Sequence, residues 1–171
     1  MACAATSPRD SLPTVGACAS IRRTGATGGR TNDDALAALK EQLGLWGLDP
    51  AGLQVVDGSG LSRRDTLAPD TLVGVLERMY DPTGASPWMT GLPVAGRDGT
   101  LENRFRNTAA EGVLRGKTGT MSNIRTLAGY VTTKDGEPLA FAIMLNNFEG
   151  TGAQAQAAID AIAIRLASFS R

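Results

Sequence analysis

The sequence of 171 residues contains no histidine, and this absence excludes two kinds of site. Without an imidazole the chain cannot build a Ser-His-Asp or Cys-His mechanism, and it lacks the commonest zinc ligand. Cysteine is scarce as well, because Cys3 and Cys18 are the only two and have no other metal-ligating partner nearby. We therefore expect no metal and no cofactor, and any general base must be a Lys, Asp or Glu.

Long apolar runs and an excess of charge are also missing. No stretch approaches the length of a membrane span, and the apolar residues 2–5 are too few for the core of a signal peptide. Seventeen basic and seventeen acidic residues cancel, so no strong field attracts nucleic acid or an anionic membrane surface. We expect no transmembrane segment and no nucleic-acid partner. The 42% apolar fraction is enough for one domain with its own core.

The first thirty residues differ in character from the rest. Residues 1–30 are rich in Ala, Ser, Thr, Gly and Arg without helical or strand periodicity, which predicts a disordered or unrelated leader. Thr31, followed three positions later by Asp34, has the pattern of a capping box and predicts a helix over 33–43. Residues 53–56 suit a short strand. Pro69 predicts the start of a second helix, and Thr100 is expected to cap a short helix through Arg106.

The second half of the chain changes to strand patterns. Residues 113–120, 126–132 and 139–145 are enriched in β-branched, aromatic or continuous apolar residues, and Asp135-Gly136 suits a tight hairpin turn. A last helix is expected over 153–169, with Ile159, Ile162, Leu166 and Phe169 on its buried side. These elements predict an α/β fold of the α+β type, in which the last helix covers one face of a three-stranded antiparallel meander and the earlier helices cover the other.

Lys117, Thr118, Gly119 and Thr120 place a charge, two hydroxyls and a residue without a side chain on the first strand. A solvent-facing lysine on an edge strand is a common structural reason for such a pattern. Lys-Thr-Gly is also a short motif that chance supplies often, so the surrounding blocks decide its interpretation. These are Leu48-Asp49-Pro50, Val56-Asp57-Gly58-Ser59-Gly60-Leu61-Ser62-Arg63, Leu92-Pro93-Val94-Ala95-Gly96, Asp98-Gly99-Thr100-Leu101, Leu127-Ala128-Gly129-Tyr130-Val131 and Asn146-Asn147-Phe148.

From about residue 31 to the end, this ordered set resembles the C-terminal part of D-alanyl-D-alanine carboxypeptidases/endopeptidases, the class C low-molecular-mass penicillin-binding proteins. The resemblance implies part of a β-lactamase/transpeptidase-like domain, located outside the cytoplasmic membrane, whose partners are peptidoglycan peptides or β-lactams. It implies that Lys117 supplies positive potential, that Thr118 binds the substrate carboxylate and that Gly119 leaves room for the peptide. It also implies that the backbone N–H of Thr120 completes an oxyanion hole.

Asp57 and Ser59 form a second candidate site, a glycine-rich turn that would belong to the active site. Ser59 lies between glycines, but no histidine is present to activate it, so a turn whose side chains bond the backbone is favoured over a nucleophile. The nucleophile of the family comes from a Ser-x-x-Lys helix, accompanied by a Ser-x-Asn motif. Neither pattern occurs in this sequence.

The missing motifs leave two interpretations. A fragment from a truncated or frameshifted reading frame is favoured, with 1–30 unrelated to the family; it would be inactive alone and a marginal monomer with exposed apolar surface. The alternative is a natural small protein that binds peptidoglycan or another partner without catalysis. A third option, an accidental Lys-Thr-Gly in a structural domain, predicts no role for Lys117.

Overall fold

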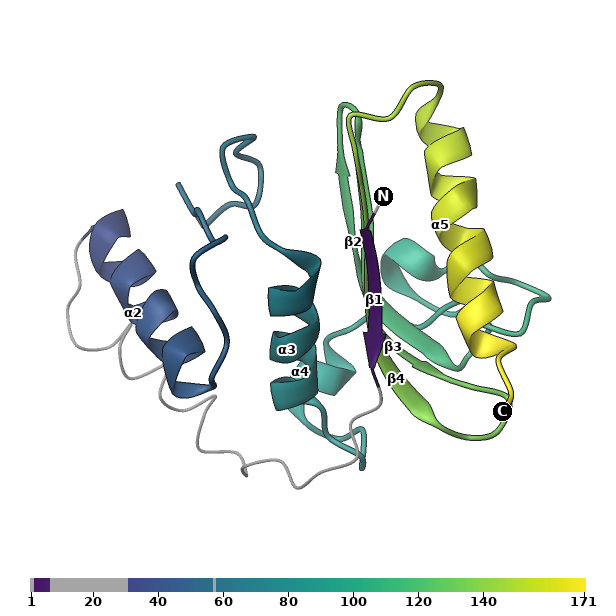
Figure 1. Cartoon of the computed structure of the whole chain (residues 1–171). Coiled ribbons are helices and arrows are strands. Elements are labelled where there is room, and N and C mark those ends of the chain that lie inside the picture. Colours follow the sequence, from purple (N-terminus) through teal and green to yellow (C-terminus); the bar gives the residue numbers. More distant parts are fainter. Residues whose placement is uncertain (1, 7–30, 57) are drawn as a thin grey trace.

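The computed structural model of the chain describes residues 2–6, 31–56 and 58–171 (Figure 1). The strands are β1 (Ala2–Thr6), β2 (Leu114–Met121), β3 (Ile124–Thr132) and β4 (Pro138–Asn146). The helices are α2 (Asn32–Leu45), α3 (Pro69–Met79), α4 (Pro87–Thr90), the 3₁₀ helix η1 (Gly99–Leu101) and α5 (Gly152–Ala167). No helix among these described residues combines the length and the apolar content that a membrane crossing needs.

The strands form one antiparallel sheet in the order β1-β4-β3-β2. The predicted meander is confirmed as β2-β3-β4, with strand ends that differ from the predicted ones by one or two residues. Two left-handed residues turn the chain: Asn123 (φ 58°) between β2 and β3, and Gly136 (φ 80°) between β3 and β4. Such conformations are cheap for Asn and Gly. The Asp135-Gly136 turn therefore lies where the sequence placed it.

Strand β1 was not predicted. Residues 2–6 pair with the outer edge of β4, from Ala2 opposite Met144 to Thr6 opposite Ala140, so the expectation of a disordered leader is wrong for these five residues. A strand edge carries unpaired N–H and C=O groups, and even a short run of small residues can satisfy them. Composition alone does not reveal that demand. The remainder of the predicted leader, 7–30, lies outside the described residues, as does Cys18.

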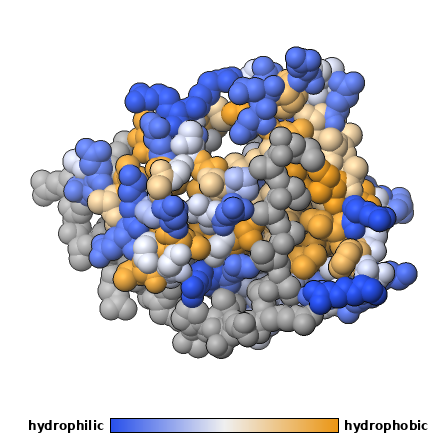
Figure 2. All heavy atoms as spheres, in the orientation of Figure 1, coloured by the Kyte–Doolittle hydropathy of each residue, from blue (hydrophilic) through white to orange (hydrophobic). Residues whose placement is uncertain are grey.

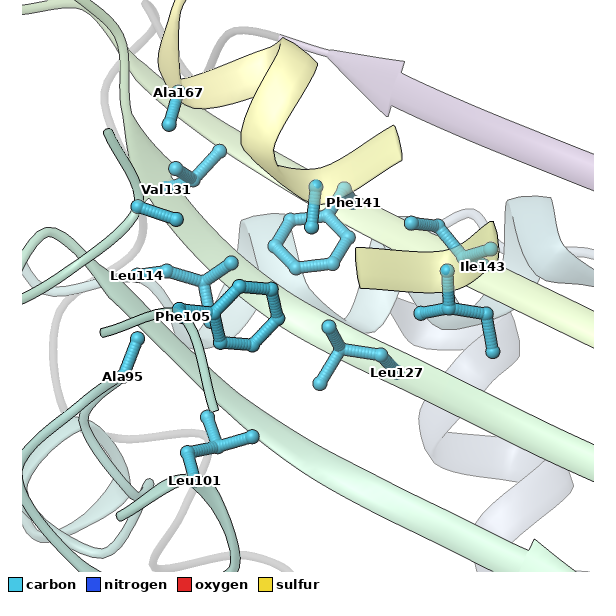
Figure 3. Packing of buried hydrophobic residues seen from close by; sticks show 12 residues of the cluster. Ala95, Leu101, Phe105, Leu114, Leu127, Val131, Phe141, Ile143 and Ala167 are labelled. Carbon is cyan, nitrogen blue, oxygen red and sulfur yellow. The ribbon is translucent and has the colours of Figure 1, made fainter. Parts of the chain in front are cut away.

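Side chains alternate between the two faces of the sheet, and each face has its own core. On one face, α5 and the η1 region cover a cluster that includes Leu114, Leu127 and Phe141 (Figure 3). On the other face, α3 and α4 cover a cluster that includes Leu76 and Tyr130. The prediction of helices on both faces is thus confirmed, because β3 and β4 supply apolar residues at both odd and even positions.

The helix ends follow their capping residues. Thr31 and Asp34 form the predicted capping box of α2, and Pro69 begins α3 as predicted. The last helix begins with a capping box of Thr151 and Gln154. Its buried side consists of residues four positions apart, most of them with small side chains: Ala155, Ile159, Ala163 and Ala167. Phe169 lies beyond the helix and is 47% exposed, so its predicted place in the core is wrong.

Two other local predictions are wrong. Residues 53–56 do not form a strand; only Gln54 pairs, in an isolated bridge to Thr66. Thr100 does not cap a helix through Arg106, because it lies inside η1 and the next turns are irregular. Phe105 (φ 67°) and Asn107 (φ 59°) are left-handed, which lets the nearly buried Phe105 reach the core and ends any helix there.

Apolar side chains reach the surface in several places among the described residues (Figure 2). The large exposed ones are Leu39, Leu45, Leu61, Val113 and Phe169. Leu39 and Leu45 come from α2, and Leu61 comes from the loop before α3. Val113 directly precedes β2, and Phe169 lies beyond the end of α5. They are therefore spread over several elements instead of forming one face.

Candidate functional site

Strand β2 lies at the edge of the sheet, and a loop of the chain covers only half of its outer side. Ala95 N donates to Leu114 O (2.9 Å), and Gly116 N donates to Pro93 O (3.0 Å). The backbone groups of Leu114 and Gly116 therefore point outward, and those of alternate residues along an antiparallel strand do the same. By this alternation Thr118 and Thr120 direct their N–H and C=O groups outward, beyond the part that residues 93–95 cover.

Lys117 and Thr118 lie on this part of the edge, which no residue that the structure describes covers, and their side chains point to opposite faces of the sheet. Lys117 is exposed, and its Nζ donates to the carbonyl oxygen of Thr118 at 2.7 Å. The hydroxyl of Thr118 lies 3.1 Å from the hydroxyl of Thr100 in η1. A cation, a hydroxyl and outward-pointing amides are thus gathered along a few residues, an arrangement suited to an extended ligand that ends in a carboxylate.

Glycines allow β2 and β3 to approach closely behind the edge. Gly119 lies opposite Thr126, and a Cβ on it would overlap Thr126 Oγ1. Gly116 lies opposite Gly129, and a Cβ on Gly129 would overlap the carbonyl oxygen of Arg115. The glycine of Lys-Thr-Gly is therefore required by packing against β3, besides leaving the edge free of a side chain.

A hydrogen-bonded tyrosine anchors the helices behind the site. Tyr130 in β3 donates its hydroxyl proton to Leu76 O at 2.6 Å and accepts from Trp88 Nε1 at 2.9 Å, which ties α3 and α4 to the sheet. Burial raises the pKa of Tyr130 well above its ordinary value of 10.0, with a further rise from Tyr80 that the Trp88 hydrogen bond opposes. The hydroxyl therefore stays protonated. Sequence reasoning placed Tyr130 only as a strand residue, because its partners lie 42 and 54 residues away.

Arg125 holds the end of β2 that follows Thr120. Its Nη1 donates to Met121 O (2.7 Å) and to Ile124 O (2.8 Å), and its guanidinium lies 5.9 Å from the centre of the Phe148 ring. These contacts close the β2-β3 turn from one side. Sequence reasoning did not select Arg125, although its position directly after the Asn123 turn is the signal that could have identified it.

The second candidate site is only partly described. Asp57 lies outside the described residues. The exposed Ser59 accepts a hydrogen bond on Oγ from Leu61 N at 3.1 Å, as expected for a glycine-rich turn. The Gln54–Thr66 bridge and a bond from Val56 N to Asp65 Oδ1 (2.7 Å) close the base of this loop, which leads into α3. This loop lies on the side of the sheet that α3 covers (Figure 1).

The residues that the structure describes contain no group of three or more His, Cys, Asp or Glu side chains that could hold a metal ion. The polar groups that the edge presents among these residues include the Lys117 ammonium, the hydroxyls of Thr118 and Thr100, and outward backbone groups.

Comparison with known proteins finds a matching family and several similar chains. Residues 19–168 match the D-Ala-D-Ala carboxypeptidase 3 (S13) family. The D-alanyl-D-alanine carboxypeptidase of Actinomadura sp. is 45% identical over 84% of this chain and 27% of its own length. The carboxypeptidase DacB of Mycolicibacterium smegmatis is 40% identical over 80% of this chain and 30% of its own length. The chain thus spans roughly a quarter to a third of these relatives.

A solved structure confirms the predicted transpeptidase-like fold. Penicillin-binding protein 4 of Haemophilus influenzae, complexed with a β-lactam, is 26% identical and covers 85% of this chain and 36% of its own chain, with a TM-score of 0.71. The β-lactam is a property of that complex. For this chain the comparison establishes the fold of its sheet and helices.

Proposed function

The chain belongs to the D-Ala-D-Ala carboxypeptidase 3 (S13) family, and from this premise we propose that β2 forms the substrate side of a site for D-Ala-D-Ala peptides. The whole site would act on peptidoglycan stem peptides, outside the cytoplasmic membrane, by a serine-type reaction through an acyl-enzyme. The observation that carries the proposal is the uncovered half of the β2 edge, where Thr118 and Thr120 direct backbone groups outward beside the Lys117 ammonium.

The geometry gives each residue a specific task. A peptide that pairs with the edge would bond the outward amides and carbonyls of Thr118 and Thr120, so it would displace Lys117 Nζ from the Thr118 carbonyl. The released ammonium would then face the ligand as an unpaired charge near its carboxylate. The Thr118 hydroxyl would donate to the same carboxylate, and the Thr120 N–H would point at a developing oxyanion. β-Lactams, which carry a carboxylate beside a reactive carbonyl, fit the same arrangement.

A calorimetric titration of the full chain with N-acetyl-D-Ala-D-Ala tests the proposal. We expect saturable binding that Lys117→Ala weakens by about tenfold, since a charge-assisted contact is lost. Lys134→Ala is the matched control, because Lys134 is also exposed but lies in the turn between β3 and β4. Equal affinities of the Lys117→Ala and Lys134→Ala proteins would contradict the proposal and favour an accidental Lys-Thr-Gly.

A second candidate function is a binding module that does not cleave its ligand. The observation that favours it is the state of Ser59, whose hydroxyl is engaged by the backbone of its own turn, together with a sequence that has no Ser-x-x-Lys. Incubation with a fluorescent penicillin separates the two functions. Binding of the peptide without a covalent label would support the module, whereas a label on Ser59 that survives denaturation would identify a nucleophile and contradict it.

A further inference from the structure

The hydroxyls of Thr100 and Thr118 form a pair that joins two elements 18 residues apart in the sequence. Thr118 lies opposite Leu127, on the face of the sheet that α5 covers, and Thr100 is next to Leu101, which is fully buried in the same cluster. The pair lies where the covered half of the β2 edge ends. Thr100 is thus bonded to Thr118, the first outward-pointing residue beyond the part that residues 93–95 cover.

The turn that carries Thr100 is held in place from several sides. Val94 N donates to Asp98 Oδ1 (2.7 Å), and Gly96 N donates to Leu101 O (3.0 Å). Gly99 has a left-handed backbone (φ +51°), and a Cβ added to it would contact the ring of Pro93. The backbone next to Thr100 is therefore restricted in conformation. Since residues 93–95 are also bonded to β2, Thr100 is fixed relative to Thr118 although its own side chain is exposed.

Counting protons shows what this pair can do. Each hydroxyl has one proton to donate and two lone pairs to accept with, and a carboxylate only accepts. Without a ligand, either hydroxyl can donate to the other across the 3.1 Å that separates them. When Thr118 donates to a carboxylate, the pair stays bonded only if Thr100 donates to Thr118.

We propose that Thr100 is a positioning residue for Thr118. It holds the Thr118 side chain in one rotamer when the site is empty, and it donates to the Thr118 hydroxyl when that hydroxyl bonds a carboxylate. Chains of hydroxyls polarise one another, so the second bond strengthens the first. The role of Thr100 in the ligand-bound site, which we call the ligand-bound half of the inference, rests on the proposed function. Its effect on the Thr118 rotamer in the empty site does not.

The first test needs no ligand. Three-bond couplings from Thr118 Cγ2 to its backbone N and C′ report the χ1 angle on isotope-labelled full-length chain. We expect values of a single rotamer in the unaltered chain and in Thr100→Ser, and averaged values in Thr100→Val, which keeps the β-branched shape but has no hydroxyl. Unchanged couplings in Thr100→Val would overturn the proposal.

The second test compares N-acetyl-D-Ala-D-Ala with its C-terminal amide. We expect Thr100→Val to weaken binding of the acid by about two- to tenfold, with the amide affected less, and Thr100→Ser to restore the acid. Equal losses for acid and amide would overturn the ligand-bound half. If the unaltered chain binds neither peptide, the proposed function fails, and the couplings alone decide the role of Thr100.

Discussion

Replacing Tyr130 by Phe removes one oxygen atom from behind the site and leaves the ring in place. Tyr130 is only 4% exposed, and its hydroxyl joins the Trp88 indole to the Leu76 carbonyl. Leu76 lies in the last turn of α3, where carbonyl groups have no partner within the helix. The substitution therefore leaves a carbonyl oxygen and an indole N–H without the partner that now satisfies them.

The expected loss follows from these two hydrogen bonds. Each is worth about 1–1.5 kcal/mol net when its partner stays behind in a buried place, so the free energy of unfolding should fall by about 2–3 kcal/mol. With an m value of about 2 kcal/mol/M, the urea midpoint should fall by about 1 M. Urea unfolding of the full chain, followed by circular dichroism and by tryptophan fluorescence, measures this shift.

Tyr80→Phe is the matched control. The Tyr80 ring packs 5.4 Å from that of Tyr130, but its hydroxyl makes no hydrogen bond among the residues that the structure describes. We expect a change below about 0.5 kcal/mol for this variant. A similar small change for Tyr130→Phe would refute the view that the tyrosine hydroxyl anchors α3 and α4 to the sheet.

The pH dependence gives a second readout of the same substitution. The pKa of folded Tyr130 is raised above the ordinary 10.0, so its contribution is fully present below pH 10 and is lost as the pH rises from 10 toward the folded pKa. In that window one proton difference lowers the free energy of unfolding by about 1.4 kcal/mol per pH unit. Tyr130→Phe should have a shallower slope above pH 10 than the unaltered chain, and an unchanged slope would contradict the assignment. Burial and the nearby Asp81 raise the pKa of Tyr80 as well, so Tyr80→Phe is not a control for this slope.

Two further variants test the packing around the edge. Gly129→Ala places a methyl group against the Arg115 carbonyl, so the free energy of unfolding in urea should fall by about 2–4 kcal/mol. The control Gly44→Ala, in an open position of α2, should raise it by up to about 1 kcal/mol. Equal effects would contradict the close approach of β2 and β3. Asp160→Asn breaks the partly buried ion pair with Arg104, whose Nε has no partner among the described residues, and should lower the free energy of unfolding by about 1–3 kcal/mol. Arg171→Ala removes an exposed ion pair and should lower it by less than about 0.5 kcal/mol in the same assay.

The sequence predicted an element correctly where the interaction that forms it joins residues close together in the chain. The capping box of Thr31 and Asp34 involves residues three apart, and the Gly136 turn depends on one dihedral angle, so both were identified. Strand β1 depends on the free edge of β4, so it did not follow from the local pattern. In the candidate site, Lys117 to Thr120 could be selected because they form one short motif with recognisable flanking blocks, and their role in binding stays a prediction. Thr100 and Tyr130 make contacts with residues 18 and 54 positions away, which only the folded chain brings together, whereas Arg125 bonds Met121 and Ile124 close by in the sequence and could have been selected.

The loop on the outer side of β2 also gives the edge a direction. Residues 93–95 run antiparallel to β2, so an antiparallel peptide on Thr118 and Thr120 would lie in the same row and point its C-terminus at Pro93. Thr118 and Thr120 are about 7 Å apart along the strand, which is the span of two extended residues. If the proposed peptide binds there, the protein's own backbone at Pro93 would lie at the end of a two-residue slot. A chain that finishes there fits, and one that continues must leave the row.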